Sequence, residues 1–569
     1  MAMNKLFYGD NLAVLRESIP SESIDLVYLD PPFNSNASYN VLFKAPTGEQ
    51  SAAQIEAFED TWHWNDTAEL AFDEVINGPN SDAMIMLRAM RSALGDNDMM
   101  AYLAMMAVRL IELRRVLKHT GSMYLHCDPT ASHYLKIILD SIFGVANFRN
   151  EIVWRRTGSH NSSKRFGPIH DVISFYTKSN SYTWNRLVRP FMKGHVDKAF
   201  KKNGDRYVTN YSGNILTGAG VRNGISGKPW RGFNPTAKGR HWAVPSILLD
   251  GYEAEVAGLD QSQKMDFLFD RGFITIKEGD EWPRYVREIT KTDGQFISDI
   301  WAYQPYTDKT VFGMEGGIDD DVRWMGSKDS DRLHYPTQKP VSLLERVVSA
   351  SSNADDLILD PFCGCGTTVH AAQKLGRRWI GIDVTHLAIG LIERRLKEAF
   401  PGLSYEVRGV PTDLGGARDL AERDKHEFQK WITASIGAQP YKGGRKGSDR
   451  GIDGYLHFRD ADRKPQFAVI SVKGGGHKSG DVRDLKGTME REKAAMGLFL
   501  SLNEPTREME REAASAGLYV TGGIKVPRLQ ILSAAAIIGG KRPQVPFGFT
   551  EGYRKAEREK ADGAQATLI

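Results

Sequence analysis

Short apolar runs alternate with amphipathic segments over residues 1–154. The run SIDLVYL, residues 23–29, is rich in β-branched and aromatic residues, which predicts a buried strand. Residues 99–121 carry Met and Leu at helical spacing, and Gly121 is the expected C-cap. A second strand, SMYLHCD, and a helix that opens on Pro129 and closes on Gly144 follow. This alternation predicts a mainly parallel sheet covered by helices.

The same alternation returns from Tyr335. TQKPVSLLERVVSASS predicts a helix, DDLILD a strand, PFCGCGTT a glycine turn, VHAAQKLG a helix and RRWIGID a strand. The two halves of the sheet are therefore expected at residues 1–154 and 333–402, separated by an inserted domain at 155–332. A linker at 403–418, a further domain at 419–545 and a tail at 546–569 complete the predicted organisation.

Charge is distributed unevenly, although the net charge is only +3. Residues 155–240 contain roughly 17 Lys and Arg against 3 Asp and Glu, with tryptophans and tyrosines between them. A basic segment with interleaved aromatic residues is typical of a nucleic-acid surface, and a solvated charged face is the alternative. The candidate phosphate contacts are Lys201, Lys202, Arg222 and Arg231.

Size and composition narrow the class of protein. A chain of 569 residues is too long for one core, so several domains are expected. No apolar run reaches the roughly 18 residues of a membrane span, and no membrane association is expected. Three cysteines make a disulfide framework improbable and favour a cytoplasmic location. Cys363 and Cys365 have no second ligand pair nearby, so no metal is expected there.

The first chemical motif is LDPPFN, which follows the strand SIDLVYL. Pro31 and Pro32 have fixed φ angles and no backbone donor, so they cannot continue a sheet. They hold Asp30 and Phe33 in a fixed arrangement just beyond the carboxyl end of the strand. In open α/β sheets this edge is where ligands bind.

The second motif, LILDPFCGCGTT, predicts a strand, a tight glycine turn and the start of a helix. Glycines let the backbone approach a ligand, and a helix start attracts an anion. Asp383 ends the next strand, where it can accept hydrogen bonds from a ribose. G-x-G-x-x-G and the G-K-[ST] of a phosphate cradle are absent, which favours S-adenosylmethionine over a cofactor with a pyrophosphate. The candidate cofactor-binding residues in this turn are Asp360, Phe362, Gly364, Gly366 and Thr367.

Together, the motifs and their order resemble the β class of DNA amino-methyltransferases, which modify an exocyclic base nitrogen. YGDN and LDPPFN stand near the start, and TQKP, DPFCGCGTT and GID follow the inserted domain. The resemblance covers about residues 3–400. It implies a Rossmann-like mixed sheet, double-stranded DNA as substrate and a target-recognition role for the inserted domain. It also implies that Asp10 contacts the cofactor adenine and that Lys339 packs by the methionine end.

The same resemblance implies a reaction. Asp30 and the carbonyl of Pro31 would accept the hydrogens of the target amine, which localises its lone pair for attack on the methyl group. Phe33 would stack on a flipped base. An acid before the prolines favours adenine N6; cytosine N4 and a protein glutamine amide are the alternatives. The polar insert with FEDTWHWND is similar to that of larger members, including modification subunits of type III systems. A homodimer and a separate restriction or defence subunit are the partners left open.

The C-terminal region resembles Mrr-type restriction endonuclease domains in HEFQKWITASIGAQPYKGGRKGSDRGIDGYLHF, FAVISVKGG and DVRDLKGTMEREKAAMGLFL. Such nucleases bind Mg²⁺ through an aspartate and a second acid or glutamine two residues before a lysine, which the resemblance places at Asp453, Ser471 and Lys473. Ser471 departs from that pattern because a hydroxyl is a poorer ligand than a carboxylate. Glu427 is a candidate for the missing acid. Conditional cleavage is slightly favoured over a module that only binds DNA or a partner.

The predicted fold class is therefore α/β. It combines a Rossmann-like methyltransferase dependent on S-adenosylmethionine, an inserted target-recognition domain, and a C-terminal α/β domain like those of restriction endonucleases.

Overall fold

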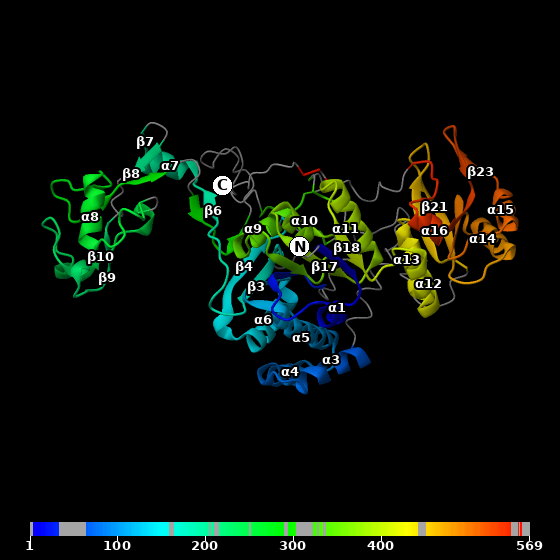
Figure 1. The fold of residues 1–569 in the computed structure, drawn as a ribbon, viewed down its shortest axis with the longest axis horizontal. Helices are drawn as coiled ribbons and strands as arrows, with labels where there is room; N and C mark the ends of the chain where they lie inside the picture. Colours follow the sequence, from blue (N-terminus) through cyan, green and yellow to red (C-terminus); the bar gives the residue numbers. More distant parts are fainter. Residues whose placement is uncertain are drawn as a thin grey trace. The chain divides into compact units, whose positions relative to one another are not determined.

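The computed structural model describes most of the chain in two compact units (Figure 1). The first unit holds the described residues up to Arg186, residues 299–302 and the described residues from 322 onward. The second holds the described residues from Leu187 to Ser298. The described residues are 4–32, 64–158, 164, 166–203, 206–209, 215–249, 252–289, 294–302, 322–326, 329, 331–333, 337–441, 451–547, 556 and 558–559.

A nine-stranded mixed sheet organises most of the first unit. Its spatial order is β15-β4-β5-β3-β2-β16-β17-β1-β18. Among the described residues β5 runs antiparallel to β3 and β4, and the other pairings in this sheet are parallel. The strands, in spatial order, are Ile300–Trp301, Phe148–Arg155, His170–Thr177, Leu117–Cys127, Ile24–Leu29, Leu357–Asp360, Arg378–Asp383, Asn4–Tyr8 and Tyr405–Arg408.

Helices cover both faces of this sheet, as the alternating pattern predicts (Figure 1). On one face lie α1 (Asn11–Ser18), α5 (Asp98–Val116) and α6 (Pro129–Phe143), with α3 (Asp66–Ile76) and α4 (Ser81–Leu94) packed outside them. On the other lie α9 (Val341–Ser351), α10 (Thr367–Lys374) and α11 (His386–Ala399). The first layer is apolar because α5 buries residues such as Leu103, Leu110 and Leu113 completely.

The junction between α5 and β3 differs from the prediction. We expected the helix to continue to Gly121, but α5 ends at Val116 and β3 starts at Leu117. A Cβ on Gly121 would lie 3.1 Å from the carbonyl oxygen of Ile24 on the neighbouring strand. The glycine therefore permits close approach of β3 to β2 and does not cap the helix.

Two predicted domain boundaries are also wrong. Residues 170–177 form β5 inside the large sheet, although we assigned everything after residue 154 to the inserted domain. This apolar strand was overlooked because the segment around it is rich in basic residues. Within the predicted linker, Tyr405–Arg408 forms β18 at the sheet edge and α12 (Leu414–Arg423) begins. Four residues are enough for an edge strand, and linker composition alone does not exclude one.

The second unit consists of short strands around a tryptophan-rich core. Its largest sheet has the order β13-β8-β7, formed by Arg287–Ile289, Arg206–Thr209 and Lys201–Asn203. Trp230 and Trp242 pack with Met265 and Leu268 of α8 (Gln261–Asp270). The remaining elements are α7 (Lys193–Ala199) and the paired strands β6 (Val188–Pro190) with β14 (Gly294–Phe296), β9 (Thr217–Ala219) with β10 (Arg240–Trp242), and β11 (Ile274–Thr275) with β12 (Arg284–Tyr285).

The C-terminal part of the first unit has its own five-stranded sheet, in the order β19-β20-β21-β22-β25. These strands are Gln439–Pro440, Gly454–Arg459, Pro465–Lys473, Met496–Ser501 and Leu529–Ser533. α12, α13 (Lys425–Ser435) and α16 (Ala534–Ile538) pack into one apolar cluster, and α14 (Ser479–Glu492) and α15 (Arg507–Ala514) into another. β23 (Leu518–Thr521) and β24 (Ile524–Pro527) form a hairpin. No helix in the described ranges is long and apolar enough to cross a bilayer.

Candidate active site

Four aspartates follow or end neighbouring strands of the large sheet. Asp10 follows β1, Asp383 ends β17, Asp360 ends β16 and Asp30 follows β2. Because these strands are parallel, their carboxyl ends meet at one edge. The structure thus places the two motifs at the same edge, although they are far apart in the sequence. Phe33 lies outside the described residues.

Asp30 is paired with a lysine from the second half of the sheet. The Nζ atom of Lys339 donates a hydrogen bond to Oδ2 of Asp30, and both side chains are largely buried. Lys339 stands immediately before Pro340, the N-cap of α9. We predicted separate roles for the two residues, at the amine and at the cofactor. The ion pair instead compensates the charge of Asp30, and the prediction that Lys339 lies beside the cofactor methionine stays a prediction.

The glycine turn between β16 and α10 has a backbone geometry that requires glycine at two positions. Gly364 and Gly366 have φ values of 51° and 74°. A Cβ on Gly366 would lie 2.8 Å from Cγ1 of Ile392. The backbone N–H of Gly364 donates to Oδ2 of Asp383 at 2.9 Å, which ties the turn to the next strand. Larger residues are therefore excluded at Gly366 by both conformation and space.

A buried arginine supports this turn from α11. Arg395 donates to the carbonyl oxygen of Cys365 at 3.0 Å and lies 3.2 Å from Oγ1 of Thr367. Sequence analysis did not identify this residue. A signal was present: Arg395 falls three residues after Ile392 on the apolar face of that helix, where an arginine needs a specific partner.

Burial controls the charge of the acids beside the turn. It raises the pKa of Asp360 to about 7, although Thr368 and the backbone N–H of Phe362 donate hydrogen bonds to its carboxylate. The negative charges of Asp30 and Asp383 raise the pKa of Asp360 further. Burial also raises the pKa of Asp383, whose oxygens accept from Thr385 and Gly364. Asp360 can therefore change charge near neutral pH.

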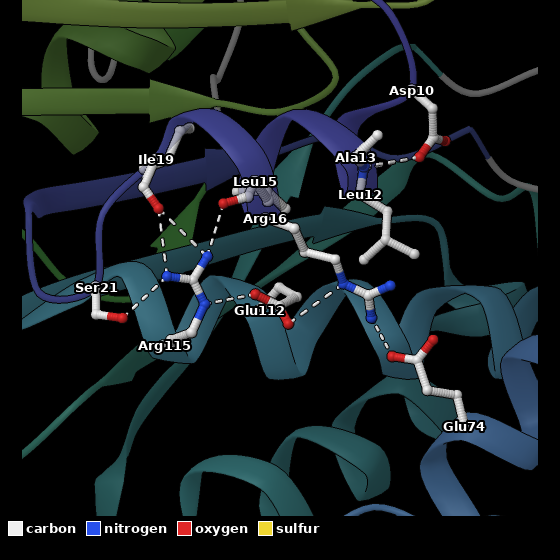
Figure 2. Close-up of polar contacts among 10 residues, drawn as sticks. All are labelled: Asp10, Leu12, Ala13, Leu15, Arg16, Ile19, Ser21, Glu74, Glu112 and Arg115. Atoms are coloured by element: carbon white, nitrogen blue, oxygen red, sulfur yellow. Dashed lines mark hydrogen bonds and ion pairs between the residues drawn. The ribbon is translucent and has the colours of Figure 1, made fainter.

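Asp10 shapes the loop after β1. Its Oδ1 accepts hydrogen bonds from the backbone N–H groups of Leu12 and Ala13, so it caps α1 (Figure 2). Its Oδ2 is 2.6 Å from the guanidinium of Arg109. Further along α1, Arg16 pairs with Glu112 of α5 and with Glu74 (Figure 2). These contacts hold α1 in place, and contact of Asp10 with the cofactor stays a prediction.

Asn11 and Arg109 connect the YGDN loop to the glycine turn, which sequence analysis did not foresee. Nδ2 of Asn11 donates to the carbonyl oxygen of Pro361 at 2.9 Å, and Nε of Arg109 donates to Oδ1 of Asn11 at 2.6 Å. The YGDN loop is thereby fastened to the glycine turn.

The edge has the donors and acceptors that S-adenosylmethionine requires. The N-cap of α10, Gly366, supplies no side-chain cap, so the helix start can receive an anionic carboxylate. Asp383 ends β17, which is the position from which an acid accepts hydrogen bonds from a ribose diol in dinucleotide-binding folds. Gly364 and Gly366 leave two positions of the turn without a side chain. The residues present therefore fit a nucleoside cofactor that carries an amino-acid end.

The predicted DNA-binding residues differ in their surroundings within the second unit. Lys201 and Lys202 are exposed on β7, and Arg222 is exposed as well. Arg231 is 3.0 Å from Asp266 and stacks over the ring of Phe269 at 4.0 Å. Its charge is therefore largely compensated by an internal contact, which weakens the prediction for this residue.

The predicted nuclease residues assemble only in part. Asp453, Ser471 and Lys473 do lie near one another around β21, and Oδ2 of Asp453 accepts from the backbone N–H of Val472 at 2.6 Å. However, Oδ1 of Asp453 accepts from Gln429 at 2.7 Å, and Lys473 faces Asp481 at 3.7 Å. Both oxygens of the expected metal ligand are thus occupied by protein donors. Over the described ranges, no group of three or more acidic, His or Cys side chains is arranged to hold a metal.

Glu427, the candidate for a second acid at this site, has other partners in the structure. Its carboxylate accepts a hydrogen bond from the hydroxyl of Tyr8, at the end of β1, and lies 3.1 Å from Lys430. The Tyr8 ring stacks on His386 at 3.7 Å between centroids. Glu427 stands in the first turn of α13 and therefore joins this helix to the large sheet through Tyr8.

Two family models match the chain. One, described as DNA methylase, matches residues 24–394. The other, described as NACHT-associated inactive Restriction Endonuclease 1, matches residues 425–527.

Individual relatives agree with the first match. Type II methyltransferase M.EcaI of Enterobacter cloacae is 28% identical over 404 residues, which are 69% of this chain and 69% of the relative. The StyLTI Mod subunit, a type III restriction-modification enzyme of Salmonella typhimurium, is 26% identical over 65% of this chain and 50% of its own. Among solved structures, the cytosine-N4-specific PvuII DNA methyltransferase aligns with a TM-score of 0.33 and 12% identity, covering 71% of this chain and 89% of that one.

Proposed function

Because the chain belongs to the DNA methylase family, we propose that it transfers a methyl group from S-adenosylmethionine to N6 of adenine in double-stranded DNA. The observation that carries this proposal is the position of Asp30, held by two prolines at the sheet edge beside the glycine turn. The cofactor supplies the methyl group on a sulfonium. Asp30 and the carbonyl oxygen of Pro31 accept the amino hydrogens, which localises the N6 lone pair and stabilises the charge that develops on nitrogen.

Adenine is favoured over cytosine by the residue before the prolines. In the β class that the motifs resemble, an acid at this position accompanies adenine N6 and a serine accompanies cytosine N4. A carboxylate accepts a hydrogen bond from an amine more strongly than a hydroxyl does. A protein glutamine is disfavoured by the exposed lysines of β7, which suit a nucleic-acid backbone.

We further propose a role in restriction–modification. The relatives named above are a type II methyltransferase and a type III Mod subunit, and each matches about two-thirds of this chain. The partner expected from this context is a separate restriction subunit. A homodimer is a second proposal, and the size of the complex in solution would test both.

The C-terminal domain is proposed to bind DNA or a partner without cutting DNA. This replaces the slight preference for cleavage that the sequence suggested. Ser471 lacks a carboxylate, Asp453 is engaged by Gln429 and Val472, and the matching family is described as inactive. Mg²⁺ is therefore not proposed as a cofactor.

The test uses DNA from cells that express the full chain, sequenced by a method that reads base methylation. We expect N6-methyladenine in one recurring sequence. Asp30→Ala is expected to lower methyl transfer at that sequence by at least about 100-fold while S-adenosylmethionine binding, measured by calorimetry, stays within a few-fold. Asp82→Ala on the exposed face of α4 is the matched control. N4-methylcytosine, or activity of Asp30→Ala within a few-fold of wild type, would overturn the assignment.

A further inference from the structure

Part of the C-terminal tail is fixed against α11, the helix that carries Arg395. Among the described tail residues, the backbone N–H of Ala556 donates to Oε2 of Glu398 at 2.8 Å. The backbone N–H of Glu559 donates to the carbonyl oxygen of Ala399 at 3.0 Å. Both acceptors are at the end of α11, and the side chain of Glu559 is only 26% exposed. The tail therefore contacts the helical layer that supports the glycine turn.

A chain of hydrogen bonds runs from this tail to the glycine turn. Oε1 of Glu559 is 2.9 Å from Nε2 of His370 on α10, and Nδ1 of His370 is 3.2 Å from Nε of Arg395. Arg395 donates to the carbonyl oxygen of Cys365 at 3.0 Å and lies 3.2 Å from Oγ1 of Thr367. The side chains of His370 and Arg395 are buried. Glu559 thus reaches the turn through two buried side chains.

The chemistry of these groups determines where the protons lie. A guanidinium only donates, so Nδ1 of His370 is the acceptor for the Nε–H of Arg395. Burial and the charge of Arg395 lower the pKa of His370 to about 4, so the neutral ring carries its proton on Nε2 and donates it to Glu559. This hydrogen bond, together with the charge of Lys374, holds the pKa of Glu559 below its ordinary value. The tail residue is therefore a carboxylate.

This carboxylate selects the form of His370 that Arg395 needs. A neutral imidazole can carry its proton on either nitrogen, and a proton on Nδ1 would face the Nε–H of Arg395. An acceptor at Nε2 favours the other tautomer and fixes the orientation of the ring, as carboxylates do behind metal-bound histidines. Lys374 holds the second oxygen of Glu559 at 3.5 Å and pairs with Glu345 at 2.8 Å. The acceptor is therefore itself held in place.

We propose that Glu559 of the C-terminal tail is a positioning residue for cofactor binding, which acts on the glycine turn through His370 and Arg395. Without this carboxylate, Arg395 is less well oriented, and the start of α10 is less well placed to receive the carboxylate of S-adenosylmethionine. This inference rests on the proposed function, because it assigns the turn to that cofactor. It makes the tail part of the methyltransferase, although the tail follows the C-terminal domain in the sequence.

The test measures binding of S-adenosylmethionine to the full chain by calorimetry. Glu559→Ala removes the acceptor, whereas Glu559→Gln keeps an oxygen that can accept from Nε2–H of His370. Arg558→Ala, which changes an exposed residue beside it in the tail, is the matched control. Glu559→Ala is also combined with His370→Phe, which keeps an aromatic ring beside Phe400 but has neither nitrogen.

Glu559→Ala is expected to weaken binding by about tenfold and to raise KM for S-adenosylmethionine, while kcat stays within about twofold. Glu559→Gln is expected to stay within about threefold of wild type, and Arg558→Ala to bind like wild type. In the His370→Phe background, Glu559→Ala is expected to change binding by less than about twofold, because no histidine links the tail to Arg395.

Wild-type affinity of Glu559→Ala would overturn the proposal. An equally large loss for Glu559→Gln, or an equally large loss in the His370→Phe background, would also overturn it, since Glu559 would then act by its charge or only by holding the tail. If His370→Phe does not fold, the comparison of the alanine and glutamine variants decides. Failure of wild type to bind S-adenosylmethionine would instead overturn the proposed function.

Discussion

At the scale of residues, four aspartates at one sheet edge have different surroundings. Asp10 caps a helix, Asp30 pairs with Lys339, Asp360 is buried, and Asp383 holds the glycine turn. Apolar runs located the strand ends at Asp30, Asp360 and Asp383, and the resemblance to the β class supplied Asp10. Neither predicted the Lys339 pair or the support from Arg395, because such contacts depend on which distant elements become neighbours.

Asp360 should make stability depend on pH. Its pKa is raised to about 7 in the folded protein, so the protonated form is favoured there. The contribution of protonated Asp360 to the free energy of unfolding is complete below about pH 4. It is lost as the pH rises through 7, by at most about 1.4 kcal/mol per pH unit. Asp360→Asn keeps the acceptor for the Phe362 N–H but cannot ionise. Its thermal midpoint is therefore expected to exceed that of wild type more at about pH 8 than at about pH 5.

Scanning calorimetry of both proteins across this range measures the difference directly. Asp355→Asn, an exposed aspartate just before β16, is the matched control. Parallel pH profiles for wild type and Asp360→Asn would contradict the raised pKa.

At the scale of elements, the hydrophobic pattern predicted strands and helices better than the distribution of charge predicted domain boundaries. The strand and helix periods identified β2, β16, β17 and α6, and the segment after the glycine turn was correctly assigned as the helix α10. Charge, in contrast, misplaced the boundary of the inserted domain, since β5 lies within a segment rich in basic residues. Gly121 was mistaken for a helix end because a glycine needed for strand approach looks the same in a sequence.

The exposed lysines of β7 yield a prediction for that element. Lys201→Glu with Lys202→Glu should weaken DNA binding and flatten its dependence on salt, because each lost phosphate contact changes the log–log slope by about 0.9. Binding is measured by anisotropy over a series of salt concentrations. The control reverses two exposed charges on methyltransferase helices, Arg114→Glu and Lys397→Glu. If the slope of the β7 variant equals that of wild type, the DNA backbone is contacted elsewhere.

At the scale of the whole molecule, a methyltransferase sheet is combined with a second, smaller sheet whose catalytic residues are incomplete. The segments that resemble nucleases contain α13, β20, β21, α14 and β22, and no elements were predicted for residues 502–545. The engagement of Asp453 by Gln429 was not foreseen, since it depends on which side chains the folded chain brings together. The position of Glu427 beside Tyr8 and His386 was missed for the same reason.

The full chain is therefore expected to leave plasmid DNA intact in Mg²⁺ and in Mn²⁺, whether or not the DNA is methylated. Asp453→Ala and Lys473→Ala should behave like wild type in this assay and in methyl transfer. Agarose electrophoresis detects single nicks in supercoiled plasmid. If wild type cuts the plasmid and both substitutions abolish the cutting, the C-terminal domain is a nuclease and the chain has two activities.

The strand order also affects how the chain folds while it is being synthesised. β1 lies between β17 and β18, and β2 has β16 beside it, so Lys5 pairs with Ile380 and Leu26 with Ile358. At a synthesis rate of about 5–20 residues per second, these partners leave the ribosome roughly 20 to 70 seconds after the first strands. During that interval β1 has neither neighbour and β2 has one open edge, and such edges are prone to pair with other chains. A nascent chain halted after the inserted domain is therefore expected to depend on chaperones and to aggregate without them.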